Sequence, residues 1–254
     1  MKSRSLFVVL LLMVGLQTAF AQNFKVYLSS KQVVEYSIEQ VDSIVFVEGT
    51  ADIPDAHEYV DLGLPSGTLW ATCNVGANSP EEYGDHFAWG ETEPKSDYSW
   101  STYKYCNGSF YTLTKYCTSS DDGSVDNKTE LEPSDDAATA NWGSGWQMPS
   151  REQCDELINS SYTTTIWTTM NGKYGRKITS KSNGNSIFLP AAGYRSDTSF
   201  YRAGSYGGYW SRSLDTSSAY SLFAYELYFN SNYICTGDND RSSGQSVRPV
   251  CVKN

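Results

Sequence analysis

The stretch 207–252 reads GGYWSRSLDTSSAYSLFAYELYFNSNYICTGDNDRSSGQSVRPVCV, and its pattern decides the fold of this chain. Side chains of a strand point alternately to its two faces, so residues 224–229 should present two different surfaces. The two expected faces are Tyr225, Leu227 and Phe229, and Ala224, Glu226 and Tyr228. A polar loop is expected at 238–241. The stretch contains no evident catalytic group, so it predicts a fold and a surface rather than a reaction.

Composition favours a β-rich globular protein with an acidic surface. The 254 residues suffice for one sizeable domain and a small accessory piece. The 19 Tyr, 7 Trp and 10 Phe, in a chain rich in Gly, Ser and Asn, predict short strands and many turns. The net charge is −10, and it becomes −12 without the two cations of residues 1–21. This charge disfavours nucleic acids and anionic membranes as partners.

Residues 1–21 have the pattern of a cleavable secretory signal. A basic start with Lys2 and Arg4 precedes the apolar run 6–16, and Ala19-Phe20-Ala21 supplies small residues before the expected cleavage site. A membrane anchor would need about 20 apolar residues, and this run is shorter. No Cys follows the run directly, so lipid anchoring is not expected. We expect export to the periplasm, the cell surface or the medium, without membrane insertion of the mature chain.

An even number of cysteines in an exported chain predicts disulfides rather than free thiols. The six are Cys73, Cys106, Cys117, Cys154, Cys235 and Cys251. Cys-x-x-Cys is absent, which argues against a zinc or thioredoxin-like site. Cys106 with Cys117 is the best single pair, because Asn107-Gly108 between them favours a chain reversal. The other pairings stay open.

The organisation expected along the chain is a small β-rich segment at 23–48, a linker at 49–56 and a main domain at 57–254. Strands are expected in the small segment at 24–28, 33–38 and 43–47, and three such strands form a weak core alone.

Within the main domain, the Pro-Ser-Gly turn at 65–67 predicts a hairpin, and short helices should begin near Pro80 and Ser150. Ser150 and Gln153 form a capping-box pattern. Residues 96–145 are polar and irregular, which is typical of a surface insertion.

Strands should return after residue 163, with turns at Asn171-Gly172 and Asn183-Gly184. These strands are expected around Ile178, 187–189, 209–210 and 224–229.

Several motifs occur in a fixed order through the main domain. They are EYVDLGLPSGTLWATCNVGANSPEEYGDHFAWGETEPK (58–95), NWGSGWQMPS (141–150), GNSIFLPAAGYR (184–195), GYWSRS (208–213) and GQSVRPV (244–250). Together they resemble the Fibrobacter succinogenes major paralogous domain, a family abundant in exported proteins of Bacteroidetes. The resemblance covers about residues 57–252. One departure is Gln147, where the family often has Arg.

The resemblance implies an α+β, C-type-lectin-like fold, shared with formylglycine-generating enzymes and with variable proteins diversified by retroelements. Residues 209–250 look especially like the variable segment of the diversified proteins, whose exposed positions bind ligand. Carried over, these positions are Tyr225, Glu226, Tyr228, Asn230, Asn232, Tyr233, Asp238, Asn239 and Asp240. Alternation alone would turn Tyr225 inward with Leu227. A reverse-transcriptase gene beside a near-copy of this coding segment would establish diversification; a solvated strand face rich in Asn and Ser is the simpler interpretation.

Catalysis is the least favoured function. The two histidines are His57, in the linker region, and His86, in an aromatic stretch, and neither is marked as a base with an orienting acid. Formylglycine-generating activity needs a reactive thiol pair, and the resemblance is to the scaffold alone. The chain is therefore expected not to be an enzyme.

Calcium is a possible ligand because C-type lectins hold sugars through it. The sugar-binding motifs of those lectins are absent, and Glu93-Pro94-Lys95 puts a cation where an amide ligand would stand. Carboxylates that could supply oxygen ligands are Asp121, Asp122, Asp126, Asp135 and Asp136. The favoured interpretation is that these loop acids cap short helices, so no cofactor and no metal is predicted.

Aromatic residues divide into two expected groups. The tryptophans of the motifs, Trp70, Trp89, Trp142 and Trp146, should lie in the core with the indole N–H bonded to backbone. Tyrosines and amides of the C-terminal strands are better suited to a surface site. The sequence thus predicts an exported, non-enzymatic binding module for a glycan or protein ligand; the alternative is a structural or adhesive surface component.

Overall fold

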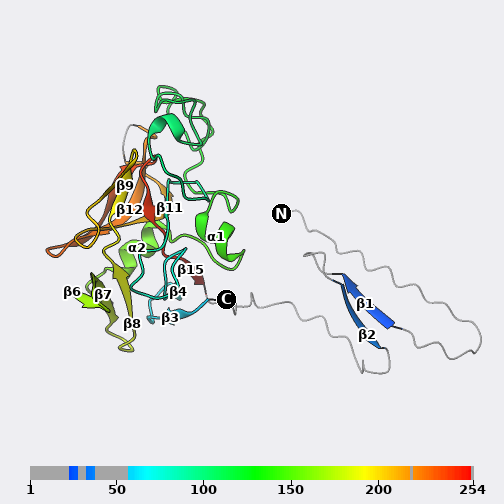
Figure 1. Cartoon of the computed structure of the whole chain (residues 1–254), viewed down its shortest axis with the longest axis vertical. Coiled ribbons are helices and arrows are strands. Elements are labelled where there is room, and N and C mark those ends of the chain that lie inside the picture. Colours follow the sequence, from blue (N-terminus) through cyan, green and yellow to red (C-terminus); the bar gives the residue numbers. More distant parts are fainter. Residues whose placement is uncertain (1–22, 28–32, 38–56, 218–219, 253–254) are drawn as a thin grey trace, which may run out of the picture. The chain divides into compact units, whose positions relative to one another are not determined.

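The computed structural model describes residues 23–27, 33–37, 57–217 and 220–252. The chain divides after Gly49 into two compact units. In the first unit, β1 (Asn23–Tyr27) and β2 (Val33–Ser37) form an antiparallel pair, which confirms the first two expected strands (Figure 1). The expected signal at 1–21, strand at 43–47 and linker at 49–56 lie outside the described residues.

The second unit is built mainly of antiparallel sheet with a few short helices, which fits the α+β class (Figure 1). Its largest sheet has the order β13-β12-β11-β14-β5, in which β11 and β14 alone run parallel. The strands of this sheet are β5 (His86–Phe87), β11 (Gly207–Leu214), β12 (Phe223–Phe229), β13 (Ile234–Asp240) and β14 (Gln245–Ser246). Within the described residues, no helix has the length and apolar character needed to cross a membrane.

Three smaller sheets complete this unit. One contains β15 (Val250–Val252), β4 (Thr68–Ala71) and β3 (Tyr59–Asp61) in that order. The second is the meander β6 (Thr163–Met170), β7 (Lys173–Ser180) and β8 (Ser186–Pro190), and the third pairs β9 (Tyr194–Ser196) with β10 (Ser199–Tyr201).

The predicted hairpins are confirmed. β3 pairs with β4 across the Pro-Ser-Gly turn, where the N–H of Gly67 donates to the carbonyl of Leu64 at 2.9 Å. Asn171 and Gly172 join β6 to β7 with φ values of +45° and +80°, the backbone that a two-residue turn of type I′ requires.

Helix α2 (Arg151–Leu157) begins where the capping box predicts it. The Ser150 hydroxyl accepts from the N–H of Gln153 at 3.2 Å, and the Gln153 side chain accepts from the N–H of Ser150 at 2.8 Å. Cys154 and Leu157 are buried on the inner face of this helix, in the core cluster that also contains Leu227 of β12.

The prediction of a helix near Pro80 is wrong. The N–H of Glu82 donates to the carbonyl of Ser79 at 3.1 Å, and the chain forms a single turn there. Gly84 then has φ +67°, and a Cβ at this position would lie 2.3 Å from the carbonyl oxygen of Val75. A left-handed residue in such a close contact ends any helix that Pro80 could start.

A helix not expected from the sequence is α1 (Ala137–Trp142). Asp136 caps it, because its carboxylate accepts from the N–H of Thr139 at 3.0 Å. This cap agrees with the interpretation of the loop acids as capping groups.

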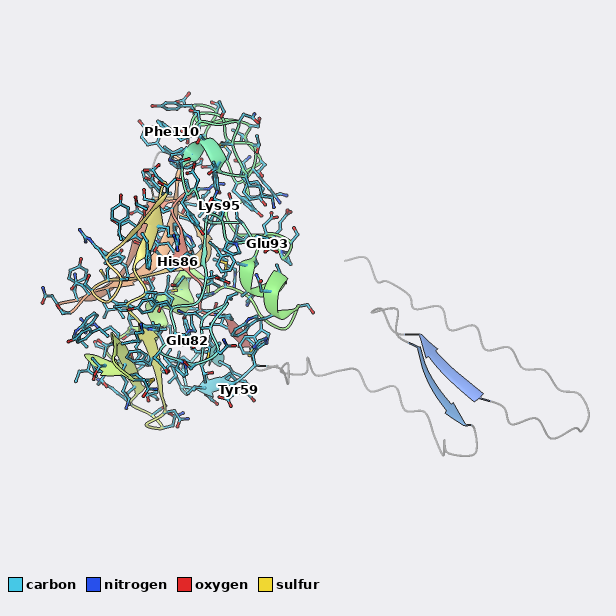
Figure 2. The ribbon with its side chains drawn as sticks, in the orientation of Figure 1. Tyr59, Glu82, His86, Glu93, Lys95 and Phe110 are labelled. Carbon is cyan, nitrogen blue, oxygen red and sulfur yellow. The ribbon has the colours of Figure 1, made fainter. Side chains whose placement is uncertain are left out.

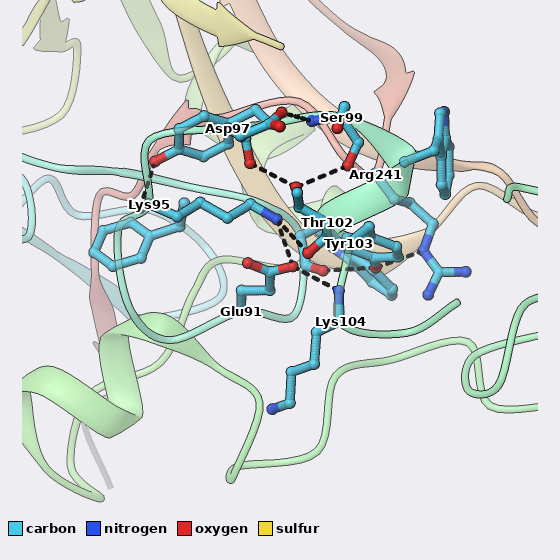
Figure 3. Close-up of polar contacts among 12 residues, drawn as sticks. Glu91, Lys95, Asp97, Ser99, Thr102, Tyr103, Lys104 and Arg241 are labelled. Atoms are coloured by element: carbon cyan, nitrogen blue, oxygen red, sulfur yellow. Dashed lines mark hydrogen bonds and ion pairs between the residues drawn. The ribbon is translucent and has the colours of Figure 1, made fainter. Parts of the chain in front are cut away.

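The insertion 96–145 is irregular, as expected, but it is not confined to the surface. Tyr98, Tyr103 and Tyr116 are buried in a core cluster, and η2 (Trp100–Thr102) lies beside it. Arg241, expected in an exposed loop, is fully buried and holds the insertion in place. Its guanidinium donates to the Tyr103 hydroxyl at 3.0 Å (Figure 3). It also donates to the carbonyl of Tyr116 at 3.0 Å.

Of the four motif tryptophans, Trp70, Trp89 and Trp146 are buried and Trp142 is half-buried. The indole N–H of Trp89 donates to the carbonyl of Ser211 at 2.8 Å, which confirms the expected bond. The indole nitrogens of Trp70 and Trp146 have no hydrogen-bond partner among the described residues, so the expectation is wrong for these two.

Cys106 and Cys117 are not bonded to each other in this structure, and their disulfide stays a prediction. All six cysteines lie in the described part of the chain and are free thiols. The Cys106 thiol donates to the carbonyl of Trp100 and the Cys117 thiol to that of Ser119, each at 3.0 Å. The two sulfur atoms therefore have separate backbone partners.

Candidate functional site

Tyrosine side chains from distant parts of the chain form a continuous row, called here the tyrosine row. In order, its members are Tyr201, Tyr194, Tyr206, Tyr228 and Tyr233. Successive ring centroids lie 5.4, 5.7, 6.1 and 5.7 Å apart. These spacings are typical of interacting aromatic pairs.

The β9–β10 hairpin supplies one end of the row. Tyr194 and Tyr201 are partners across the hairpin, so their side chains share one face, and their rings stack at an interplanar angle of 22°. The two-residue turn Asp197-Thr198 fixes this register, with Asp197 at φ +50°.

Neighbouring strands make room for the other end of the row. On β13, Gly237 leaves space for the Tyr228 ring, because a Cβ at Gly237 would lie 2.6 Å from a carbon of that ring. Tyr233, in the turn before β13, meets Tyr228 edge to face. The two ends of the row are open: Tyr201 is 43% exposed and Tyr233 is 45% exposed, whereas the three rings between them are half-buried.

A buried carboxylate lies beneath the middle of the row. Glu226 is only 3% exposed and is bound from three sides. The Tyr206 hydroxyl donates to Oε1 at 3.1 Å, the Asn239 amide to Oε1 at 3.3 Å, and the Gln245 amide to Oε2 at 2.6 Å. Burial raises the pKa of Glu226 to about 7, against the opposing effect of these hydrogen bonds.

The predicted ligand-binding residues separate into groups, and one group lies at the row. Tyr228 and Tyr233 belong to it, and Asn239 lies on the same strand face. Asn230 and Asn232 form the turn between β12 and β13, where the Asn230 side chain accepts from the N–H of Asn232 at 2.8 Å. The expected exposure of Glu226 is wrong, because this side chain lies beneath the surface.

The remaining predicted residues lie on the opposite face of the sheet. Tyr225 is paired with Asp238 across β12 and β13, and Asp240 follows on the same side. Tyr225 is buried: Arg151 of α2 stacks 4.1 Å from its ring centroid and donates to its hydroxyl at 2.8 Å. Asp238 and Asp240 are exposed on the edge strand. None of these three residues therefore lies on the sheet face that carries the tyrosine row.

Three members of the row, Tyr194, Tyr201 and Tyr206, were not predicted, because they precede the segment 209–250 that the resemblance singles out. A signal was present in the sequence. Tyr194 and Tyr201 are equally spaced about Asp197-Thr198, and a two-residue turn at that dipeptide places them opposite each other.

Four of the five acids considered for calcium, Asp122, Asp126, Asp135 and Asp136, have structural partners. Asp126 accepts from the N–H groups of Tyr116 and Cys117 at 3.0 and 2.9 Å, and Asp122 is buried and accepts from the N–H of Ser221. In the described ranges, no group of three or more His, Cys, Asp and Glu is arranged to hold a metal ion.

Comparison with known proteins identifies one family model that matches part of the chain. Residues 153–250 match the family described as Domain of unknown function (DUF8237). The match begins in α2 and includes every strand that carries the tyrosine row. No curated protein matches the chain, and no solved structure matches it.

Proposed function

We propose that the protein is an exported, non-enzymatic binding module that recognises a glycan or a protein surface through the tyrosine row. The observation that carries this proposal is the row itself, with its open ends and its polar borders at Asn232 and Asn239. Tyrosines offer large rigid contact areas with hydroxyl groups, at a low cost in conformational entropy. The secretory pattern of residues 1–21 supports export.

A glycan fits this surface well. Pyranose rings present C–H groups on their faces and hydroxyls at their edges, so they pack on aromatic rings while bonding to amides and phenols. The tyrosine row combines both kinds of group over five successive rings, which suits a chain of several sugars. A protein ligand would instead pack its own side chains against the exposed rings of Tyr201 and Tyr233 at the two ends of the row.

The proposed fold of residues 57–254 is C-type-lectin-like, as the family resemblance implies. Antiparallel sheets and short helices support this assignment. Further support comes from the Trp-Gln-Met-Pro-Ser motif, which leads directly into the capped helix α2.

The decisive experiment screens the mature chain, residues 22–254, on glycan and protein arrays. The variant Tyr201→Ala/Tyr233→Ala should lose at least about tenfold in affinity for any ligand found, since aromatic anchors dominate binding energy. Tyr162→Ala is the matched control, because Tyr162 is also exposed, at 38%, but lies in the turn before β6. Equal loss in the double variant and the control would contradict the proposal.

The alternative, a structural or adhesive component, is favoured by the small N-terminal unit. β1 and β2 form a two-stranded sheet, and such a pair is marginally stable by itself. If its role is to pack into an assembly, deleting residues 23–48 should abolish assembly and leave array binding intact. The opposite pattern, with assembly intact after the deletion, favours the binding module.

A further inference from the structure

A polar pocket of about 460 Å³ is open beside the β9–β10 hairpin. Its lining includes Asp85, His86, Lys95, Tyr98 and Arg195. Arg195 is the hairpin partner of Phe200, so both side chains lie on the face opposite to Tyr194 and Tyr201. The pocket is therefore separate from the tyrosine row, although one hairpin contributes to both. His86 and Lys95 lie in the middle of the domain in Figure 2.

Arg195 is held in place by contacts of its ring-stacked side chain and its backbone. Its guanidinium lies 4.9 Å from the ring centroid of Phe200, and its backbone exchanges hydrogen bonds with Gly244 at 2.8 and 2.9 Å. Among the described residues, no carboxylate and no hydrogen-bond acceptor contacts this guanidinium. By contrast, the arginines whose guanidinium groups donate to protein acceptors are Arg151, Arg176, Arg212, Arg241 and Arg248.

The second cation in the lining is already neutralised. Lys95 forms an ion pair with Glu91 at 2.9 Å and donates to the carbonyl of Thr102 at 3.2 Å (Figure 3). Lys95 therefore contributes its alkyl chain to the pocket lining, and its charge is already paired with Glu91. The Lys95 ammonium also lies 5.7 Å from the centroid of the Tyr98 ring.

The histidine of the pocket is neutral at physiological pH. His86 is buried in β5, its Nε2 lies 3.2 Å from the carbonyl of Ala192, and its ring meets Phe200 edge to face. Burial, together with the charge of Arg195, lowers the pKa of His86 to about 4. Arg195 is thus the available positive charge in the lining, and the exposed Asp85 is the available negative charge.

We propose that this pocket binds a small carboxylate ligand that carries a hydroxyl or ammonium donor near the carboxylate. The Arg195 guanidinium binds the ligand carboxylate through two parallel N–H donors. Arginine forms its strongest hydrogen bonds to carboxylates in this bidentate geometry. Asp85 accepts a hydrogen bond from the ligand's donor group. A phosphate dianion fits less well, because a single free guanidinium would have to balance two charges beside Asp85.

This ligand chemistry occurs in acidic sugars and in α-amino acids, and the experiment distinguishes the two sources. Titrations of the mature chain, followed by calorimetry or ligand-observed NMR, use glucuronate, serine, acetate, glucose and inorganic phosphate as probes. We expect glucuronate or serine to bind at least about tenfold more tightly than glucose, because the guanidinium–carboxylate contact is charge-assisted. The same ligand should bind more tightly than acetate and phosphate.

Variants assign the contacts. Arg195→Gln should weaken binding at least about tenfold, and Arg195→Lys should restore part of it, since a charge without the fork geometry remains. Asp85→Asn should remove the preference of the site for glucuronate or serine over acetate. The affinity for acetate itself should stay the same or increase. Arg202→Gln is the matched control: it removes a charge just after β10, from an exposed side chain that does not line the pocket.

Two results would overturn the proposal. One is the absence of glucuronate and serine binding up to about 20 mM, because a desolvated charge-assisted pair should give a higher affinity than that. The other is binding that Arg195→Gln leaves unchanged, or that phosphate exceeds. Array binding through the tyrosine row is measured separately, so failure of this site and failure of the proposed function are distinguishable.

Discussion

The hydroxyl of Tyr206 donates a hydrogen bond to the buried carboxylate of Glu226 at 3.1 Å. This contact joins the central ring of the tyrosine row to a group that titrates near neutral pH. The burial of the phenol and the nearby carboxylate both raise the pKa of Tyr206, so this hydroxyl remains a donor throughout the accessible pH range. The strength of this hydrogen bond therefore depends on the protonation of Glu226, because a carboxylate is a stronger acceptor than a carboxylic acid.

Glu226→Gln should remove a pH dependence from the stability of the protein. Burial raises the pKa of Glu226 from 4.5 to about 7, so between these values the native state keeps a proton that the unfolded chain has lost. The free energy of unfolding of the wild type should fall as pH rises through this window, by about 3 kcal/mol in total from this group. In the variant this component is absent, because an amide does not titrate.

Urea denaturation of both proteins at several pH values measures the difference. The other groups near Glu226, including Tyr206, Asp238 and Gln245, are the same in both chains, so the difference isolates the carboxylate. A constant difference between about pH 4.5 and about pH 8 would show that Glu226 titrates near its ordinary value.

Local signals in the sequence predicted local structure well. The Ser150–Gln153 capping box and the Asn171-Gly172 turn each specify a short backbone path through contacts within a few residues. The helix near Pro80 failed, although its first turn had favourable residues. There the close approach of Gly84 to Val75, nine residues earlier in the chain, determined the backbone.

The candidate site was harder to predict, because strand alternation shows which residues share a face but does not show whether that face is buried. Alternation correctly separated Glu226 and Tyr228 from Tyr225. It could not show that both faces of β12 are covered, one by α2 and the other by Gln245 and the tyrosine row. The pairing of Tyr194 with Tyr228 through Tyr206 depends on strands far apart in the sequence.

Tyr225→Phe should reduce stability without affecting ligand binding. The change removes the Tyr225 hydroxyl, which accepts from Arg151 at 2.8 Å and also interacts with Asp215 and Ser217, and it keeps the stacking of Arg151 on the ring. The free energy of unfolding should fall by about 1 kcal/mol or more, since one such bond contributes about 1 kcal/mol. Array binding should match the wild type, because Tyr225 lies on the α2 side of the sheet. Loss of binding in a stably folded variant would return Tyr225 to the ligand site.

Arg248→Met should be strongly destabilising. The buried guanidinium donates to the Asn74 side chain at 2.8 Å and to three backbone carbonyls, those of Ala71, Thr72 and Phe188. Removing the donors leaves buried acceptors without partners, at a cost of about 3 kcal/mol or more. Arg202→Met, at an exposed side chain, should change the free energy of unfolding by less than about 0.5 kcal/mol. Equal effects in chemical denaturation would contradict the structural role of Arg248.

The thiols should be reactive in an order set by their burial. Cys73 and Cys235 are half-buried, whereas the other cysteines are buried, and burial raises the pKa of the Cys154 and Cys251 thiols. An alkylating reagent should therefore modify Cys73 and Cys235 first in the native protein, since the thiolate is the reactive form. After unfolding without reductant, mass spectrometry should show all six alkylated. A smaller number would mean that some of these cysteines form disulfides, as the sequence pattern predicts.

Gly237→Ala should weaken ligand binding through the position of a neighbouring ring. The new methyl group would lie 2.6 Å from a carbon of the Tyr228 ring, so the ring must move away from β13. Tyr228 stands between Tyr206 and Tyr233, and its displacement interrupts the row. Binding to the ligand of the wild type should fall at least about tenfold, while alanine in place of glycine in a strand changes stability by about 1 kcal/mol or less.

Two readouts check this prediction. Ring-current shifts of Tyr206 and Tyr233 in NMR spectra report the displaced ring directly, and a binding isotherm reports its effect on the ligand. Thr236→Ala is the control on the same strand, because Thr236 faces α2 and donates to Asp155 at 2.6 Å. It should leave both readouts at the wild-type values. If Gly237→Ala shifts the ring resonances and binding persists unchanged, Tyr228 does not contact the ligand, and the binding surface is limited to other members of the row.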